Sequence, residues 1–133
     1  MKILVCISHV PDTTSKIQFD PDGNSLDKNG IQFVINPYDE FGLTKSLQLK
    51  EKHGGSVSVI TFGDTSVEAT LRKALAIGAD EAHRIDGIPL DGIQTAEELS
   101  NFVVKNSFDL IICGQESIDY NGGIVPGALA AIL

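Results

Sequence analysis

The sequence has no tryptophan, only two cysteines and fewer basic than acidic residues. Cys6 and Cys113 lie far apart in the sequence without a CxxC partner, so they indicate neither a zinc site nor a disulfide framework. Each lies in an apolar run, which predicts buried free thiols and a cytoplasmic location. Ten Lys and Arg residues against 18 Asp and Glu residues give a formal charge of -8, which disfavours nucleic acid as a partner.

Long apolar runs and the common nucleotide-binding and catalytic motifs are also missing. The apolar start at residues 1–8 falls short of the roughly 20 residues of a membrane span and lacks a signal cleavage site, so we expect a strand there and no membrane insertion. Neither GxxxxGK[ST] nor GxGxxG occurs, which argues against a P-loop and a dinucleotide fingerprint. His9, His53 and His83 lack metal-ligand spacing and no GxSxG elbow occurs, so we predict neither a metal site nor catalytic residues.

The chain of 133 residues, 42% of them hydrophobic, has the size of one domain, so we expect residues 1–133 to share a single fold. Runs rich in apolar and β-branched residues predict four strands, at 2–8, 56–62, 82–86 and 108–114. The first, second and fourth runs are almost continuously apolar. That pattern is typical of strands buried on both faces of a parallel sheet.

Helix signals lie between these runs. Asn36 followed by Pro37 has the pattern of an N-cap and a first helical residue, which predicts a helix that ends near His53. Residues 65–68 and 95–98 each have capping-box spacing ahead of an apolar stripe, which predicts two further helices. A last helical run is expected from residue 128 onward.

The segment between residues 11 and 33 interrupts this rhythm. Its Pro21-Asp22-Gly23-Asn24 turn separates short apolar patches, so we interpret it as a small hairpin insertion after the first strand. Elsewhere, the alternation of strands and helices predicts an α/β fold with a doubly wound, mostly parallel sheet. Ligands of such sheets bind beyond the carboxyl ends of the strands.

Small and polar residues gather at those predicted strand ends, at residues 6–12, 61–64 and 113–119. The last of these segments continues through Gly122 and Gly123 into the final helical run. The backbone N–H groups of such a turn can bind a phosphate. Glycines at a strand-to-helix turn also serve backbone geometry alone, so these residues by themselves leave both interpretations open.

Five ordered blocks of the sequence resemble the electron transfer flavoprotein beta subunit. They are KILVCISHVPD at 2–12, NPYDE at 36–40, KEK at 50–52, LRKALAIGAD at 71–80 and GQESID at 114–119. The resemblance covers the whole chain. Members of that family continue well beyond residue 133, so the resemblance implies the N-terminal part of a longer subunit.

The resemblance implies an adenine nucleotide alpha-hydrolase-like, Rossmann-like fold in which the beta subunit buries an AMP. It also implies a heterodimer with an alpha subunit that holds most of the redox FAD. By matching positions, the residues that would contact the nucleotide are Cys6, Asn36, Pro37, Tyr38, Asp39, Phe62, Gly114, Gln115, Glu116, Ser117, Ile118, Asp119, Asn121, Gly122, Gly123, Ile124 and Val125.

The residues at the end of the last turn are compatible with either of two ligands, AMP or a second FAD. Val125 stands where AMP-binding relatives often have Thr, and Gly122, Gly123 and Ile124 before it offer only backbone donors. Phosphate contacts would therefore come from backbone N–H groups. Bifurcating relatives, which bind a second FAD in the same pocket, often have Val at this position, so AMP is expected with a second FAD as the alternative.

The implied role is electron transfer without catalysis by side chains, because a flavin must supply the redox chemistry. The resemblance implies electrons received from acyl-CoA and related dehydrogenases, as in fatty acid beta-oxidation, and passed to a quinone oxidoreductase or similar acceptor. A stand-alone ATP-binding regulator resembling universal stress proteins shares this sheet, but residues 114–117 lack the second glycine of its phosphate loop. An adenylating enzyme of similar fold needs Ser-Gly-Gly-x-Asp-Ser after the first strand, where this chain has Ser-His-Val-Pro-Asp.

Overall fold

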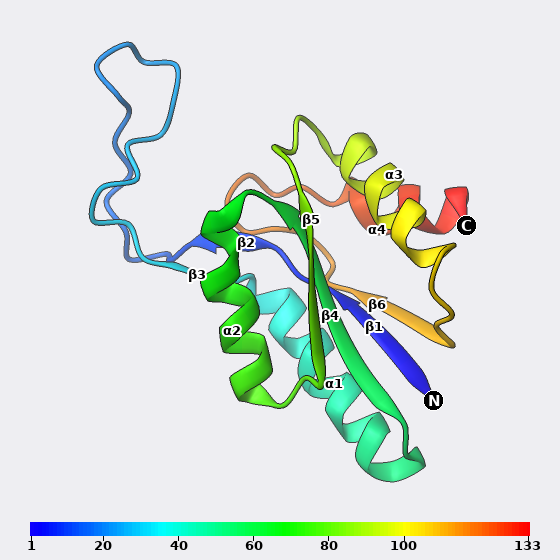
Figure 1. The fold of residues 1–133 in the computed structure, drawn as a ribbon. Helices are drawn as coiled ribbons and strands as arrows, with labels where there is room; N and C mark the ends of the chain where they lie inside the picture. The colour runs from blue at the N-terminus through cyan, green and yellow to red at the C-terminus, as the bar shows by residue number, and fades with distance from the viewer.

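Four parallel strands form the central sheet. The computed structural model, which describes residues 1–133, places them in the order β5-β4-β1-β6 (Figure 1). They are β1 (Lys2–Cys6), β4 (Ser56–Gly63), β5 (Glu81–Asp86) and β6 (Leu110–Cys113). β1 pairs in parallel with β4 and β6, and β4 pairs in parallel with β5. The prediction of a mostly parallel sheet is confirmed.

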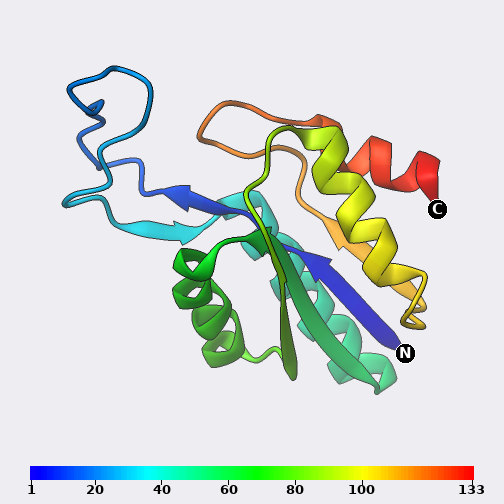
Figure 2. The ribbon, with the colours of Figure 1, turned by 45° about the horizontal axis from the view of Figure 1, so that its top comes forward.

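Helices cover both faces of this sheet. They are α1 (Pro37–His53), α2 (Glu68–Ile77), α3 (Gly92–Val103) and α4 (Ile124–Ile132), with a short 3-10 helix η1 (Thr65–Val67) before α2. α1 and α2 lie on one face, and α3 and α4 lie on the other (Figures 1 and 2). This arrangement confirms the doubly wound α/β fold. None of the helices has the length and apolar character needed to cross a bilayer.

The side chains of β1 alternate between two hydrophobic cores, as the pleat of a strand requires. Ile3 and Val5 pack on the side of α1 and α2, whereas Leu4 and Cys6 pack on the side of α3 and α4. Ile3, Leu4 and Val5 have no exposed surface. Burial on both faces explains why this run is continuously apolar.

β6 is an edge strand, which corrects the expectation that the fourth apolar run is buried on both faces. It pairs only with β1, and all of its residues are half-buried. A strand with a single neighbour keeps more solvent contact than a central strand of the same composition. The apolar pattern therefore identified the strand but not its place in the sheet.

Three predicted helix starts also need correction. Asp64, not Thr65, caps η1, because its carboxylate accepts the Ser66 N–H at 2.8 Å, and α2 begins only after that turn. α3 begins about one turn before Thr95, because the Asp91 carboxylate accepts the Gln94 N–H at 2.8 Å. α4 likewise begins about one turn before residue 128. At η1 and α3, the N-cap is therefore an aspartate, Asp64 or Asp91, and not the threonine of the predicted capping box.

The hairpin insertion is confirmed. Its base consists of β2 (His9–Pro11) and β3 (Phe33–Ile35), which pair antiparallel. Further out, an isolated bridge joins Phe19 to Leu26. The segment between β2 and β3 projects away from the sheet and helices in both views (Figures 1 and 2). The hairpin therefore leaves the fold at the carboxyl end of the sheet, where a ligand is expected.

Candidate functional site

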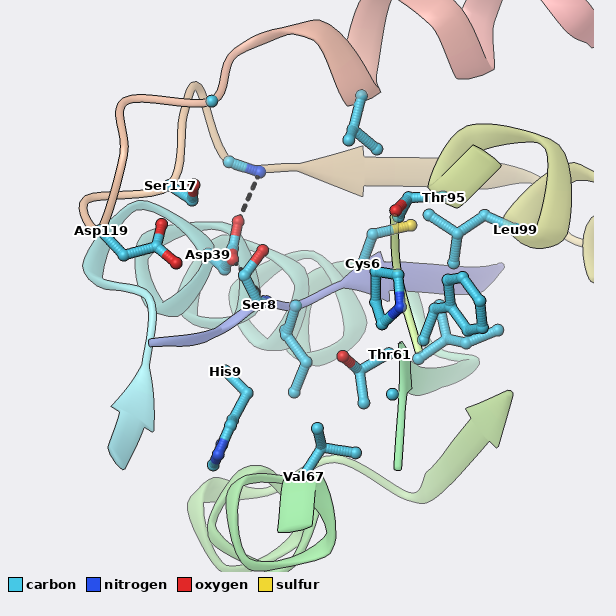
Figure 3. Close-up of a pocket in the computed structure, with 18 of the residues that line it drawn as sticks. Cys6, Ser8, His9, Asp39, Thr61, Val67, Thr95, Leu99, Ser117 and Asp119 are labelled. Atoms are coloured by element: carbon cyan, nitrogen blue, oxygen red, sulfur yellow. Dashed lines mark hydrogen bonds between the residues drawn. The ribbon is translucent and has the colours of Figure 1, made fainter. Parts of the chain in front are cut away.

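A cavity of about 360 Å³ lies beyond the carboxyl ends of the parallel strands. Cys6, Thr61 and Cys113, at or near the ends of β1, β4 and β6, contribute to its lining. Further lining residues come from the β6–α4 loop, the β5–α3 loop, the base of the hairpin, η1 and the helices α1, α3 and α4. In Figure 3, labelled side chains from the strand ends, η1, α1, α3 and the β6–α4 loop surround one space. This is the edge at which a doubly wound sheet presents a ligand site.

Asp39, in the first turn of α1, ties the ends of two strands together. Its carboxylate accepts the Ser8 N–H at 2.8 Å and the Gly114 N–H at 2.9 Å (Figure 3). A Cβ on Gly114 would lie 2.2 Å from the Asp39 carboxylate, so this contact requires glycine. Burial raises the pKa of Asp39, although its hydrogen bonds oppose that shift. Asp39 is therefore a buried carboxylate on the cavity wall.

Asn36 holds the β6–α4 loop instead of capping α1, which corrects its predicted capping role. Its side chain makes no capping hydrogen bond. The amide nitrogen donates to the Glu116 carbonyl at 2.8 Å, and the amide oxygen accepts the Ile118 N–H at 3.2 Å. With only 1% of its surface exposed, Asn36 shapes the loop from behind.

The β6–α4 loop closes on itself beside the cavity. The Ser117 N–H donates to the Gly122 carbonyl at 3.0 Å, and Asn121 adopts a left-handed backbone with φ 56°. The Ser117 hydroxyl is buried and has no hydrogen-bond partner within the protein. Buried hydroxyls are nearly always paired, so this one is available to a ligand.

The start of α4 leaves backbone donors free next to that hydroxyl. Gly123 occupies the N-cap position, and no side chain caps the helix. The N–H groups of Gly123, Ile124 and Val125 donate to no acceptor in the protein, and Pro126 supplies no N–H. Val125 and Pro126 line the cavity. Together with the helix dipole, these donors make this end of the cavity suited to an anion.

The opposite wall is built at the base of the hairpin. The His9 ring stacks on Phe33 with centroids 4.3 Å apart, and its Nδ1 lies 2.7 Å from the Thr70 hydroxyl oxygen. Burial lowers the pKa of His9, and the nearby Lys28 lowers it further. These contacts fix the hairpin base against α2. They also bring Lys28, which belongs to the projecting segment, into the cavity lining.

Phe62 and the β5–α3 loop form a third wall. A Cβ on Gly87 would lie 2.5 Å from the Phe62 ring, so the loop approaches the ring closely only because this residue is glycine, with φ 157°. Thr95 and Leu99 of α3 continue the wall (Figure 3). This part of the cavity offers aromatic and aliphatic surface, which suits a planar ring.

The charged side chains of the lining are mostly acidic. Lys28 is the only Lys or Arg, and His9 the only histidine, against the carboxylates of Asp39, Asp64, Glu116 and Asp119. An anionic ligand therefore depends on the backbone donors of α4 for much of its stabilisation. Nowhere in the chain do three or more His, Cys, Asp or Glu side chains gather so that they could hold a metal ion.

The structure separates the residues implied by the resemblance into two groups. Those that line the cavity are Cys6, Asp39, Phe62, Gly114, Glu116, Ser117, Asp119, Gly122 and Val125. Those outside its lining are Asn36, Pro37, Tyr38, Gln115, Ile118, Asn121, Gly123 and Ile124. Among the second group, Asn36 supports the loop, and Gly123 and Ile124 contribute the free backbone donors described above.

Some lining residues lie outside the set that the resemblance implies. His9 and Asp64 belong to the strand ends at 6–12 and 61–64, where a ligand was expected, so their position in the sequence was the signal for them. Lys28 and Gly87 gave no such signal. The hairpin carries Lys28 back to the cavity, and the β5–α3 loop folds over Phe62, so both placements depend on tertiary contacts.

The sheet, its two helix layers and the cavity at its carboxyl edge define a doubly wound α/β domain with a site for a small molecule. The family model described as electron transfer flavoprotein domain matches residues 24–133. The chain belongs to this family.

Relatives support the same assignment. Electron transfer flavoprotein subunit beta of Thermoanaerobacterium thermosaccharolyticum is 40% identical over 122 residues, with 90% of this chain and 46% of that protein covered. Protein FixA of Sinorhizobium fredii is 39% identical over 127 residues, with 90% and 44% covered. Electron transfer flavoprotein subunit beta of Bacillus subtilis is 35% identical over 137 residues, with 100% and 52% covered.

The expected resemblance to the beta subunit is thereby confirmed, and it is favoured over the stand-alone regulator and the adenylating enzyme. The chain spans about half the length of the curated relatives it matches.

Proposed function

We propose that this chain is the nucleotide-binding part of an electron transfer flavoprotein beta subunit and that its cavity holds AMP. The observation that carries the proposal is the pairing of an unpartnered, buried Ser117 hydroxyl with free N–H groups at the start of α4. Both are hydrogen-bond donors, and they lie in the same loop-helix junction. A phosphate is the ligand that satisfies such donors at a helix N-terminus.

The remaining surfaces suit the rest of a nucleotide. Phe62 and the apolar side chains beside it provide contact area for an adenine ring. The Asp39 and Asp119 carboxylates on the cavity wall can accept hydrogen bonds from ribose hydroxyls. The residues that would hold the nucleotide therefore come from the ends of β1, β4 and β6, the start of α1 and the start of α4.

The size of the space is sufficient for AMP, which we take as the first candidate. A volume of about 360 Å³ lies near the lower end of the range of ligand pockets, roughly 300–1,000 Å³, which suits a mononucleotide. Val125 presents an apolar side chain to the cavity, so the phosphate contacts fall to the backbone. A second FAD is the alternative that the ligand analysis below distinguishes.

The role proposed for the whole protein is electron transfer with an alpha subunit as partner. FAD shared with that subunit supplies the one- and two-electron chemistry. The residues of this chain bind and orient the nucleotide and exclude water from its phosphate end, so the chain is a carrier subunit and not an enzyme. The proposed electron donors are acyl-CoA and related dehydrogenases, and the proposed acceptor is a quinone oxidoreductase or similar protein, with the complex in the cytoplasm.

Ligand analysis of the full-length subunit with its alpha partner tests this function. After denaturation, the released compounds are identified by mass spectrometry and by flavin absorbance. We expect one AMP per beta subunit and one FAD per heterodimer. Two FAD molecules and no AMP would identify the bifurcating alternative, and ATP without flavin would contradict the proposal.

A matched pair of serine variants tests the phosphate end. Ser117→Ala removes a hydroxyl that has no protein partner, so we expect unchanged or slightly increased stability together with an about tenfold loss of AMP affinity. Ser100→Ala removes a buried hydroxyl that donates to the Glu97 carbonyl at 2.7 Å, away from the cavity, so it should lower stability and leave AMP affinity unchanged. Urea unfolding and AMP titration measure the two effects. Unchanged AMP affinity in Ser117→Ala would remove this hydroxyl from the site.

A further inference from the structure

The two cysteines of the chain lie directly opposite each other on neighbouring strands. Cys6 ends β1, Cys113 ends β6, and the two are register partners in the parallel pairing of these strands. Hydrogen-bonded strands are about 4.7–4.9 Å apart, and a disulfide needs Cα atoms about 4.4–6.8 Å apart. The backbone separation of this pair therefore suits a disulfide.

Both side chains point to the same side of the sheet. Leu4 and Cys6 of β1 pack in the core beneath α3 and α4, and Ile111 and Cys113 of β6 pack against that same core. The intervening Val5 and Ile112 face the other core. Alternation along both strands thus brings the two sulfur atoms together and not to opposite faces.

Both cysteines also reach the cavity, which gives them access to small molecules. Each contributes to the cavity lining, and Cys113 is half-buried, whereas only 7% of Cys6 is exposed. They are free thiols in this structure. The proposed nucleotide site uses their surface but not their thiol chemistry.

We propose that Cys6 and Cys113 form a dithiol site on the cavity floor, which hydrogen peroxide oxidises to a disulfide joining β1 to β6. A Cys113 thiolate attacks one peroxide oxygen, the O–O bond breaks, and the departing hydroxide takes a proton to become water. The Cys6 sulfur then attacks the resulting Cys113 sulfenic acid. An S–S bond forms, the S–O bond breaks, and the second oxygen leaves as water with the Cys6 proton.

The order of attack follows from the exposure of the two sulfur atoms. Cys113 is half-buried on the edge strand β6, whereas Cys6 is buried on the central strand β1. Burial raises the pKa of the Cys6 thiol, which disfavours its thiolate. Cys113 is therefore the sulfur that peroxide reaches first, and Cys6 is the resolving thiol.

Peptide mapping of the full-length subunit in complex with its partner tests the proposal. The reduced complex, with its bound ligands as purified, is treated with a small excess of hydrogen peroxide. We expect a cross-linked peptide that contains Cys6 and Cys113, lighter by two hydrogen atoms, with loss of both thiols and full recovery by dithiothreitol. Mapping distinguishes this pair from any cysteine elsewhere in the longer chain.

Single variants provide the matched controls. In Cys6→Ser the cross-link should vanish and Cys113 should stop at a sulfenic acid that dimedone traps. In Cys113→Ser the thiol of Cys6 should react at least tenfold more slowly than Cys113 does in Cys6→Ser. Circular dichroism checks that both variants are folded. The proposal is overturned if the unaltered protein gives sulfinic acid at Cys113 without the cross-link, or if both thiols survive the treatment.

Discussion

At both ends of the parallel sheet, an aspartate carboxylate accepts backbone N–H groups of the strands or of the residues that follow them. At the amino end, the Asp80 carboxylate accepts the Val57 N–H at 2.8 Å and also pairs with Lys50. At the carboxyl end, the Asp39 carboxylate accepts the N–H groups of Ser8 and Gly114. Each aspartate therefore fixes the start or the end of strands by accepting backbone donors.

Their surroundings differ. The side chain of Asp80 is 38% exposed and the Lys50 hydrogen bond lowers its pKa, whereas Asp39 is only 4% exposed and burial raises its pKa. The amino end thus places its carboxylate in solvent beside a cation. The carboxyl end buries a carboxylate without a cation, next to a cavity. Burial of an unpaired acid is unfavourable for folding, which is typical of a functional edge and not of a purely structural one.

Removing the two carboxylates should give the largest contrast. Asp39→Ala leaves two backbone N–H groups without their acceptor, and we expect it to lower the free energy of unfolding by about 2–4 kcal/mol. Asp80→Ala removes a largely solvent-screened pair and one backbone acceptor, so about 1 kcal/mol is expected. Urea unfolding of the full-length subunit measures both. Equal losses would mean that the two ends are held in the same way.

Substitution of a glycine should affect AMP affinity at the carboxyl end and stability at the amino end. Gly123→Asp places a carboxylate at the free N–H groups of α4, so we expect AMP affinity to fall on the order of 100-fold while the fold survives. A Cβ on Gly123 would come no closer than 3.5 Å to its neighbours, so Gly123→Ala should bind AMP almost normally.

Gly55 at the amino end is the structural counterpart. It has φ 115°, and a Cβ there would lie 1.9 Å from the Met1 carbonyl oxygen, so Gly55→Ala should lower stability without changing AMP affinity in the folded fraction. AMP titration and circular dichroism separate the two outcomes. Full AMP occupancy in folded Gly123→Asp would place the phosphate elsewhere.

Asn36→Ala tests how much the β6–α4 loop contributes to stability and to AMP binding. Two hydrogen bonds to the β6–α4 loop are lost, so we expect a loss of about 1–2 kcal/mol in stability and weaker AMP binding. Asn36→Asp keeps an acceptor for the Ile118 N–H but turns a carboxylate oxygen toward the Glu116 carbonyl in a buried place, so it should destabilise the protein at least as much as Asn36→Ala. Asp109→Ala, at the amino end, removes the exposed acceptor of the Lys2 N–H and should leave AMP affinity unchanged.

The smallest effect expected is an opposite pH dependence of the two aspartates. The unfolded pKa of each is about 3.9. The pKa of Asp39 is raised in the folded protein, so its contribution is greatest below pH 3.9 and is lost as the pH rises through the folded pKa. The pKa of Asp80 is lowered, so its contribution is present above pH 3.9 and is lost as the pH falls through the folded pKa.

Unfolding free energies of Asp39→Asn and Asp80→Asn, measured between about pH 3 and 6, test these signs. The destabilisation caused by Asp39→Asn should shrink as the pH rises, and that caused by Asp80→Asn should grow. The same trend in both variants would contradict the contrast between the two ends.

The sequence predicted the helices and strands better than the contacts between them, for a physical reason. α1 has the predicted bounds because Asn-Pro begins it and Gly-Gly ends it, and both signals are local. Asn is a common N-cap residue, but the side chain of Asn36 instead makes two hydrogen bonds to the β6–α4 loop, which is distant in the sequence. Lys28 reaches the cavity only because the hairpin folds back. Local patterns fix elements, whereas the lining of a cavity depends on contacts between elements distant in the sequence.

The projecting segment between β2 and β3 can be altered without disturbing the sheet. The two strands leave and re-enter the fold side by side, held by the β2–β3 pairing and the stacked His9 and Phe33 rings. Nothing lies within 4 Å of the position of a Cβ at Gly23, near its tip. The tip of the segment, beyond the bridge between Phe19 and Leu26, can therefore be labelled with a fluorophore at an exposed residue other than Gly23, while Lys28 and the register of the sheet are kept. An optical reporter placed there would be carried on the same hairpin that brings Lys28 to the cavity.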